Sequence, residues 1–295
     1  MLRILPKVYH LGPVLSLYPK TMFNRLIPVA LLVFGATLSL GAHAQTSAQA
    51  QSPQPSVPGY VPRDALPNSL MLLSPAPDPH SATQARDDAA ESAANAYRQG
   101  PRWALAALDA DLSFPSAAGT FSCALGVNVS PETTPHLYTM LERVRVDAGR
   151  STGLAKDQYN RQRPFVVVGG ATCKPQDEAD LRHNGSYPSG HSTIGWSWAL
   201  VLAEADPDQG AAILARGRAF LQSRVVCNVH WLSDTEAGGL LAAAVVARLH
   251  DEPAFVADMK ASEAEIQAAH AAGQKPSRDC AAEAAAIASA PNLQP

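Results

Sequence analysis

The chain has 295 residues, enough for one large domain or two small ones. Its formal net charge of −3 at pH 7 excludes the strongly basic balance of a nucleic-acid-binding protein. A cationic functional site must therefore be a local concentration of Lys and Arg. Ala-rich segments and few alternating β-branched residues predict a mostly helical protein, an all-α single-domain helical bundle.

Residues 1–44 are typical of a secretory signal peptide. Within them an apolar stretch from Leu26 to Leu40 precedes the sequence AHA at residues 42–44, an A-x-A cleavage site. Residues 1–21 do not resemble a signal n-region, so Met22 is an alternative start. A membrane anchor is the competing interpretation, but the apolar run is shorter than the roughly 20 residues that a spanning helix needs. We therefore expect a periplasmic protein without stable membrane association after cleavage.

The rest of the chain divides by composition into three parts. Residues 45–66 are rich in Gln, Ser and Pro and predict a flexible leader, residues 67–270 form the domain, and residues 271–295 form a disordered tail. The sequence FVVVGG at residues 165–170 is interpreted as a short extended connection. Helices are expected near residues 82–98, 101–110, 134–160, 189–204, 208–224, 229–250 and 253–270.

The four cysteines, Cys123, Cys173, Cys227 and Cys280, predict up to two disulfides if the protein is exported. Three pairings are possible, and the sequence does not choose among them. Metal ligation is disfavoured because no two cysteines have C-x-x-C spacing.

A first cationic cluster contains Lys156 and Arg163, seven residues apart and followed by Pro164. On a continuous helix this spacing brings both side chains onto one face. Pro164 disfavours helical geometry at Arg163, so the helix should end there and leave Arg163 free to turn inward. A solvated basic face is the alternative interpretation of this pair.

A second cluster is the sequence PSGH at residues 188–191, directly before a long apolar run. It predicts a helix start with His191 in the first turn, where unpaired N–H groups favour an anion. Gly190 permits close approach of a ligand, and Ser189 offers a hydroxyl and an N–H. A helix cap with an incidental histidine is the alternative.

A third cluster contains Arg224, His230 and Asp234. His230 and Asp234 have i,i+4 spacing, so the carboxylate can orient one ring nitrogen and leave the other with a free lone pair. A helix break near Cys227 and Asn228, with Asn228 as a possible N-cap, would let Arg224 and His230 converge. A surface ion pair is the alternative.

Together the clusters supply three cations, a helix N-terminus and two histidines, one of them oriented by a carboxylate. A phosphoryl group requires this set: charge-assisted donors for its oxygens, a nucleophile and an acid for the leaving group. No H-E-x-x-H motif, Asp-rich metal box or phosphate-binding P-loop occurs, so we expect neither a metal nor another cofactor.

These blocks resemble the phosphatidic acid phosphatase type 2 (PAP2) superfamily, and within it the bacterial class A non-specific acid phosphatases. The pattern K-x6-R-P, P-S-G-H and S-R-x5-H-x3-D is present in order and at full spacing, and the likeness extends from about Leu70 to Phe255. Ser192 stands where these phosphatases usually have Thr, which retains a hydroxyl.

The resemblance implies acid-optimal, metal-independent hydrolysis of phosphate monoesters, with a broad substrate range, a phosphotransferase side activity and a homodimer. It further implies residue roles. His230 is the nucleophile that forms a phosphohistidine, Asp234 orients it, and His191 is the general acid and base. The phosphate-binding residues are Lys156, Arg163, Ser189, Gly190 and Arg224.

Three other functions compete with this one: a vanadate-dependent haloperoxidase on the same scaffold, an integral lipid phosphatase, and a non-enzymatic phosphate-binding protein. The second needs several membrane helices, and the third does not need an oriented histidine. Among the remaining side chains, His183 is interpreted as a surface loop residue, Trp196 and Trp198 as core, and Tyr187 as a residue of the pocket mouth.

Overall fold

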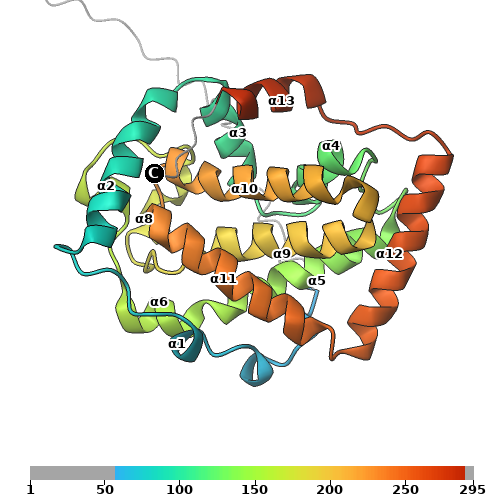
Figure 1. Ribbon diagram of the computed structural model, residues 1–295, viewed down its shortest axis with the longest axis horizontal. Coiled ribbons are helices and arrows are strands. Elements are labelled where there is room, and N and C mark those ends of the chain that lie inside the picture. Colours follow the sequence, from blue (N-terminus) through green and yellow to red (C-terminus); the bar gives the residue numbers. More distant parts are fainter. Residues whose placement is uncertain (1–56, 290–295) are drawn as a thin grey trace, which may run out of the picture. The chain divides into compact units, whose positions relative to one another are not determined.

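The computed structural model describes residues 57–289, which lie in one compact unit. The predicted signal peptide and most of the predicted leader lie outside these residues. The described part contains no strand, which confirms the all-α prediction (Figure 1). Its α-helices are α1 (Ser69–Leu72), α2 (Ala82–Ala94), α3 (Pro101–Asp109), α4 (Ser122–Leu125), α5 (Pro135–Ser151), α6 (Gly153–Tyr159), α7 (Pro164–Val167), α8 (Glu178–Leu181), α9 (Gly190–Ala205), α10 (Gly210–Val226), α11 (Leu232–Leu249), α12 (Pro253–Ala271) and α13 (Cys280–Ala288).

Helix α9 is the centre of the bundle. It packs against α5, α10, α11 and α12, because its apolar side chains point in nearly every direction (Figure 1). A Cβ at Gly195 would lie 2.2 Å from the ring of Phe220, so only glycine lets α10 approach this closely. Trp198 is buried, as expected of a core residue, and its indole N–H donates to the carbonyl of Leu141.

The chain is anchored to the domain at Tyr60 and Val61, which corrects the prediction that the leader is flexible as far as residue 66. Tyr60 and Val61 are buried, and their backbone N–H groups donate to the carboxylate of Asp147 on α5, at 2.7 and 3.4 Å. The ring of Tyr60 also lies 3.6 Å from the guanidinium carbon of Arg143, a cation–π contact. A buried carboxylate and an aromatic anchor therefore hold a segment whose composition predicts flexibility.

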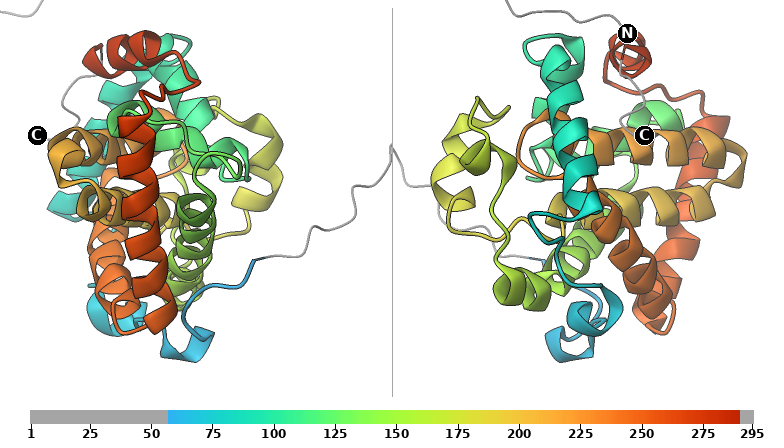
Figure 2. Two further views of the ribbon diagram at one scale, coloured as in Figure 1. Left: turned by 90° about the vertical axis from the view of Figure 1, so that its right-hand side faces the viewer. Right: turned by 60° about the vertical axis from the view of Figure 1, so that its left-hand side comes forward.

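The tail also differs from the prediction, because residues 280–288 form helix α13 rather than a disordered segment. The Cys123–Cys280 disulfide fixes the start of α13, and Glu283 forms an ion pair with the buried Arg216 of α10. The second disulfide joins Cys173 to Cys227, so both pairs are now assigned. In Figure 2, α13 lies beside α3, and α12 runs alongside α5.

Two local predictions were wrong. The expected helix 134–160 is interrupted at Thr152, so that α5 and α6 are separate helices. The sequence FVVVGG is not extended: with Pro164 in the first helical position, residues 164–167 form the short helix α7, and Gly169 and Gly170 follow with positive φ. In both cases the local composition is outweighed by capping and turn residues.

No helix among residues 57–289 combines the length and the apolar character needed to span a bilayer.

Candidate active site

The three sequence clusters converge at one end of the bundle, where α9 begins, α10 ends and α11 begins (left side of Figure 1). The backbone N–H of Ser189 donates to the carbonyl of Asp234 at 2.9 Å, which ties the start of α9 to the first turn of α11. A Cβ at Gly238 would lie 2.7 Å from the carbonyl oxygen of Ser189, so glycine is required at this contact. Two of the clusters are thereby locked together through their backbones.

Lys156 and Arg163 reach the site by a different route from the one predicted. Helix α6 ends at Tyr159, and Asn160 has a left-handed backbone (φ 38°) that turns the chain out of the helix. Arg163 is extended (φ −81°, ψ 154°), as expected before Pro164. The two side chains therefore do not share a helix face; a turn brings them together.

The predicted break between Arg224 and His230 is confirmed. Helix α10 ends at Val226, and α11 begins only at Leu232, three residues later than expected. Asn228 does not cap α11. It adopts a positive φ of 62° in the connection, and Trp231 is the N-cap residue. His230 consequently lies on the segment before α11 and not on the helix itself.

His230 is almost fully buried between a guanidinium and a carboxylate. Its Nε2 lies 3.0 Å from Nη1 of Arg163, which can only donate, so Nε2 carries the lone pair. Its Nδ1 lies 3.4 Å from Oδ2 of Asp234, longer than an ordinary hydrogen bond. Burial, and then the charge of Arg163, lower the pKa of His230 well below its ordinary value, which favours the neutral ring.

Asp234 lies beside His230 and also accepts hydrogen bonds from three other residues. Its carboxylate accepts from Nη1 of Arg161 (2.6 Å), from the hydroxyl of Ser186 (2.7 Å) and from the backbone N–H of Trp231 (2.8 Å). The last bond closes the first turn of α11. These contacts fix the carboxylate in place beside the imidazole.

Arg161 and Asp87 were not predicted to contribute to the site. Arg161 bridges Asp234 and the fully buried Asp87 of α2, at 2.6 and 2.7 Å. Arg161 lies between Lys156 and Arg163 in the K-x6-R-P block, and a third cation so close to two others could have been expected to pair with a carboxylate. For Asp87 the sequence carries no such signal, since it lies 74 residues before Arg161.

His191 lies in the first turn of α9, as predicted, and is half-buried. Its Nε2 lies 3.2 Å from the carbonyl oxygen of Ala110, at the end of α3, so this nitrogen carries the proton. Burial, followed by the charge of Arg224, lowers the pKa of His191 well below its ordinary value. In the free protein the ring is therefore neutral.

The pKa values of the buried cations are lowered, chiefly by burial. Burial and the neighbouring Arg163 lower the pKa of Lys156 to about 7, and burial lowers the pKa of Arg163 to about 10. Burial and then Arg163 likewise lower the pKa of Arg224 to about 10. Arg224 is buried, yet its Nε and Nη1 have no hydrogen-bond partner among the described residues. This arrangement is suited to an anion with several oxygens.

The start of α9 adds further donors. As helix-start groups, the N–H groups of Gly190 and His191 have no acceptor within the helix. The N–H of Ser189 is already used by Asp234, contrary to prediction, but its hydroxyl oxygen accepts from the N–H and the hydroxyl of Ser192 and retains its own proton. Ser189 thus contributes a hydroxyl and not an amide.

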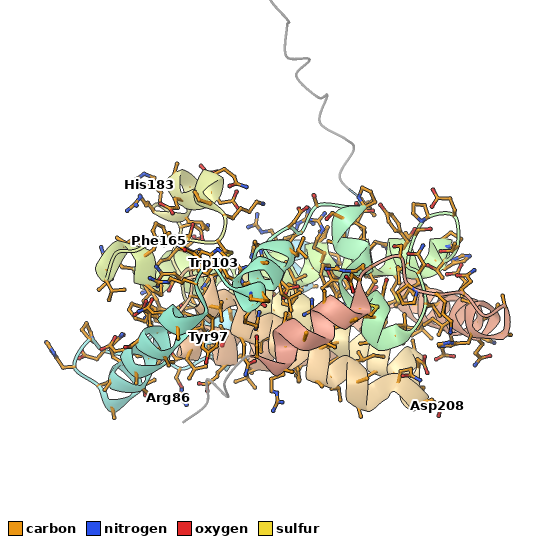
Figure 3. All side chains as sticks on the ribbon, turned by 90° about the horizontal axis from the view of Figure 1, so that it is seen from above. Arg86, Tyr97, Trp103, Phe165, His183 and Asp208 are labelled. Carbon is orange, nitrogen blue, oxygen red and sulfur yellow. A yellow bond between two sulfur atoms is a disulfide. The ribbon has the colours of Figure 1, made fainter. Side chains whose placement is uncertain are left out.

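A pocket with a volume of about 380 Å³ opens onto this cluster. Lys156, Asn184, Gly190 and His191 line it on the side of the predicted site. Tyr187, predicted at the pocket mouth, does not line it; its hydroxyl donates to the carbonyl of Ser74. His183 is exposed on the turn after α8, at the outer edge of the molecule in Figure 3, as expected of a surface residue.

Comparison with known proteins assigns the chain to a family. A profile of the PAP2 superfamily matches residues 137–252, which include all three clusters. The chain is 38% identical over 246 residues to an acid phosphatase of Zymomonas mobilis subsp. mobilis, an alignment covering 83% of this chain and 89% of that protein. The chain belongs to the PAP2 superfamily.

Two more relatives of this PAP2 protein are non-specific acid phosphatases. That of Salmonella typhimurium is 41% identical over 199 residues, covering 67% of this chain and 79% of the relative. That of Providencia stuartii is 41% identical over 197 residues, covering 66% and 79%. These comparisons confirm the resemblance predicted from the three blocks.

Proposed function

We propose that this protein is an acid phosphatase that hydrolyses phosphate monoesters without a metal, through a phosphohistidine on His230. The observation that carries the proposal is the lone pair on Nε2 of a neutral, buried His230 facing the cation Arg163. A nucleophile adjacent to a cation is placed where an anionic phosphorus centre would bind. The relatives named above support the same reaction class.

The charge of the cluster matches a phosphate dianion. Lys156, Arg163, Arg224 and Arg161 carry four positive charges, and Asp87 and Asp234 carry two negative ones. With Lys156 protonated, the six groups leave an excess of two positive charges, opposite to a monoester dianion. Lys156, Arg163 and Arg224 bind the phosphate oxygens, with the Ser189 hydroxyl and the Gly190 amide as further donors.

In the first chemical step, Nε2 of His230 attacks phosphorus and a P–N bond forms as the P–O ester bond breaks. The imidazole becomes cationic, and the carboxylate of Asp234 beside Nδ1 stabilises the charge. His191 donates a proton to the departing alkoxide oxygen. In the second step His191 takes a proton from water, the hydroxide attacks phosphorus, the P–N bond breaks and phosphate leaves.

His191 must be protonated at the start, yet the free site keeps it neutral. A bound dianion supplies the missing negative charge and favours the imidazolium. Since protonation is easier in acid, the reaction should run best below neutral pH. Lys156, whose pKa is about 7, must also be protonated to bind phosphate, which favours the same pH range.

The test is hydrolysis of p-nitrophenyl phosphate from about pH 4 to 8 with EDTA present, for the wild type, His230→Ala and His136→Ala. His136 is the matched control, because its side chain is 59% exposed and lies on the first turn of α5. We expect acid-optimal, EDTA-resistant activity that falls about a thousandfold or more in His230→Ala and stays unchanged in His136→Ala.

Rapid quenching of the wild type in alkaline sodium dodecyl sulfate with ³²P-labelled substrate should trap a base-stable, acid-labile phosphoprotein that His230→Ala lacks. Activity that survives in His230→Ala would identify a different nucleophile. Loss of activity in EDTA, restored by a divalent cation, would refute the metal-free mechanism. Peroxide-dependent halide oxidation with added vanadate, and no hydrolysis, would favour the haloperoxidase.

The residues assigned to phosphate binding would contact the phosphoryl group and not the alcohol, so we infer a broad range of leaving groups and transfer of the phosphoryl group to alcohols in place of water. Relatives that are acid phosphatases are consistent with small phosphomonoesters as substrates. The periplasmic location and the homodimer stay predictions.

A further inference from the structure

The outer wall of the pocket contains two arginines that the proposed reaction does not use. Arg63 and Arg150 line the same 380 Å³ pocket as Lys156 and His191, and both are exposed. They also line the adjoining cavity of about 410 Å³, so they lie at the border between the two. Asp157 is the one carboxylate in the lining of the first pocket. Apart from the residues assigned to phosphate binding, the charged side chains of the lining are therefore mostly cationic.

Hydrogen bonds between the chain just before Arg63 and Asp147 of α5 hold Arg63 at this position. Asp147 is fully buried and binds the backbone of Tyr60 and Val61, only two residues before Arg63. Nη2 of Arg63 lies 3.7 Å from the position of a Cβ on Gly153, at the start of α6. A Cβ at this position would therefore be in ordinary van der Waals contact with the guanidinium. The N-terminal segment thus carries a cation to the pocket mouth.

Arg150 reaches the same pocket from the last turn of α5. Among residues 57–289, neither Arg63 nor Arg150 forms an ion pair or a side-chain hydrogen bond, unlike Arg86, Arg143 and Arg161. Two guanidiniums facing one pocket without carboxylate partners are available to an anionic ligand. Since the phosphate under attack is held by the inner cations, the ligand of the outer pair must belong to the leaving group.

We propose that Arg63 and Arg150 bind a second phosphate on the leaving group, so that bisphosphorylated substrates are preferred over monophosphates of the same skeleton. This inference rests on the proposed phosphatase function. The preference is electrostatic and should weaken with salt, because both arginines are exposed to solvent. Arg63 and Arg150 have no role in the hydrolysis of a monophosphate whose leaving group is uncharged.

The test compares butane-1,4-diyl bisphosphate with butyl phosphate, which have nearly identical leaving alcohols. kcat/KM for the first phosphate released is divided by two, because the bisphosphate has two equivalent ends. The proteins are the wild type, Arg63→Gln, Arg150→Gln, the double variant, and Arg218→Gln as a control. Arg218 is an exposed arginine of α10 that lines neither cavity, so it removes the same charge elsewhere.

We expect each single variant to lower kcat/KM for the bisphosphate about fivefold and the double variant about twentyfold, as for exposed charge-assisted contacts. Butyl phosphate and the control should change less than about twofold, and about 0.5 M NaCl should remove most of the difference. Asp157→Asn should shift the ratio of the two substrates the opposite way, because it removes the opposing charge.

A ratio that stays the same in all variants would overturn the inference, while hydrolysis of butyl phosphate would leave the proposed function intact. A wild type that hydrolyses neither compound would instead overturn the proposed function. Equal losses for both substrates in the double variant would also contradict the inference, because they would place the arginines in the chemistry common to both.

Discussion

Replacing Arg161 with Met should destabilise the protein strongly, because Arg161 is a nearly buried cation between two buried carboxylates. The guanidinium side chain is 8% exposed, and the two carboxylates it bridges, Asp87 and Asp234, are fully buried. Removing the cation leaves two buried negative charges without a counter-ion. Breaking a buried pair in this way costs about 3–5 kcal/mol, against a total stability of about 5–15 kcal/mol.

For a domain of this size, about 2–4 °C of Tm is lost per kcal/mol, so Tm should fall by about 6–20 °C at pH 7. Part of the loss should be recovered by a second change, Asp87→Asn, which removes one of the two stranded charges. The activity of Arg161→Met should fall through kcat, since Asp234 no longer has a fixed position beside His230.

The assay is thermal unfolding followed by circular dichroism at pH 7, with steady-state kinetics on the folded variant. Arg86→Met is the control. Arg86 lies on the same helix as Asp87 and pairs with Glu236, but the side chains of this pair are 34% and 41% exposed. An exposed pair contributes at most about 1 kcal/mol. A Tm loss in Arg161→Met no larger than in the control, or one unaffected by Asp87→Asn, would refute the reasoning.

Three further predictions concern the cations and the covalent frame. Sulfate, a dianion at every pH tested, should inhibit hydrolysis less strongly as the pH rises through about 7, where Lys156 loses its proton, and Lys156→Met should abolish this pH dependence of Ki. Arg224→Met should raise Tm at pH 7. The pKa of Arg224 is lowered to about 10 in the folded protein, so the charged guanidinium opposes folding at pH 7, and its removal should stabilise the fold. The kcat/KM of this variant should fall at least about a hundredfold. The double variant Cys123→Ser, Cys280→Ser should lose about 2–4 kcal/mol of its free energy of unfolding, measured in urea at 25 °C, because the disulfide joins residues 157 positions apart in the sequence. Its activity at 25 °C should stay close to that of the wild type. A pH-independent Ki in wild type, a lower Tm in Arg224→Met, or an unchanged urea midpoint without the disulfide would each contradict the corresponding argument.

The sequence predicts the chemical groups of the site better than their geometry. Lys156, Arg163 and His230 were identified because phosphoryl chemistry restricts which residue types can occur and the motif spacings are fixed. The route that brings them together was partly missed, because it depends on how single residues end helices. Asn160 illustrates this: a left-handed C-cap is a known use of asparagine, yet the apolar pattern alone runs past it.

Long-range partners could not be predicted at all. Asp87 joins the site through contacts with Arg161 and with Ser233, which lies 146 residues away in the sequence, and Asp147 anchors Tyr60 across 87 residues. Each shares its helix with at least one other carboxylate, and a solvated surface position is the usual expectation for such a residue. Only packing decides that these carboxylates are buried, and burial obliges them to find a donor.

Burial and the neighbouring cations act on both histidines in the same direction, although the proposed roles require opposite protonation states. Burial first, and then the charges of Arg163 and Arg224, lower the pKa of His230 and of His191, which favours neutral rings while the site holds no anion. In the proposed mechanism, a bound phosphate dianion offsets the charges of these arginines and favours protonation of His191. In the free site Arg163 donates to Nε2 of His230, so this hydrogen bond must pass to a phosphate oxygen before Nε2 can attack phosphorus. Substrate binding is therefore expected to produce the acid at His191 and to free the nucleophile at His230 through the same groups, the cations that bind the phosphate.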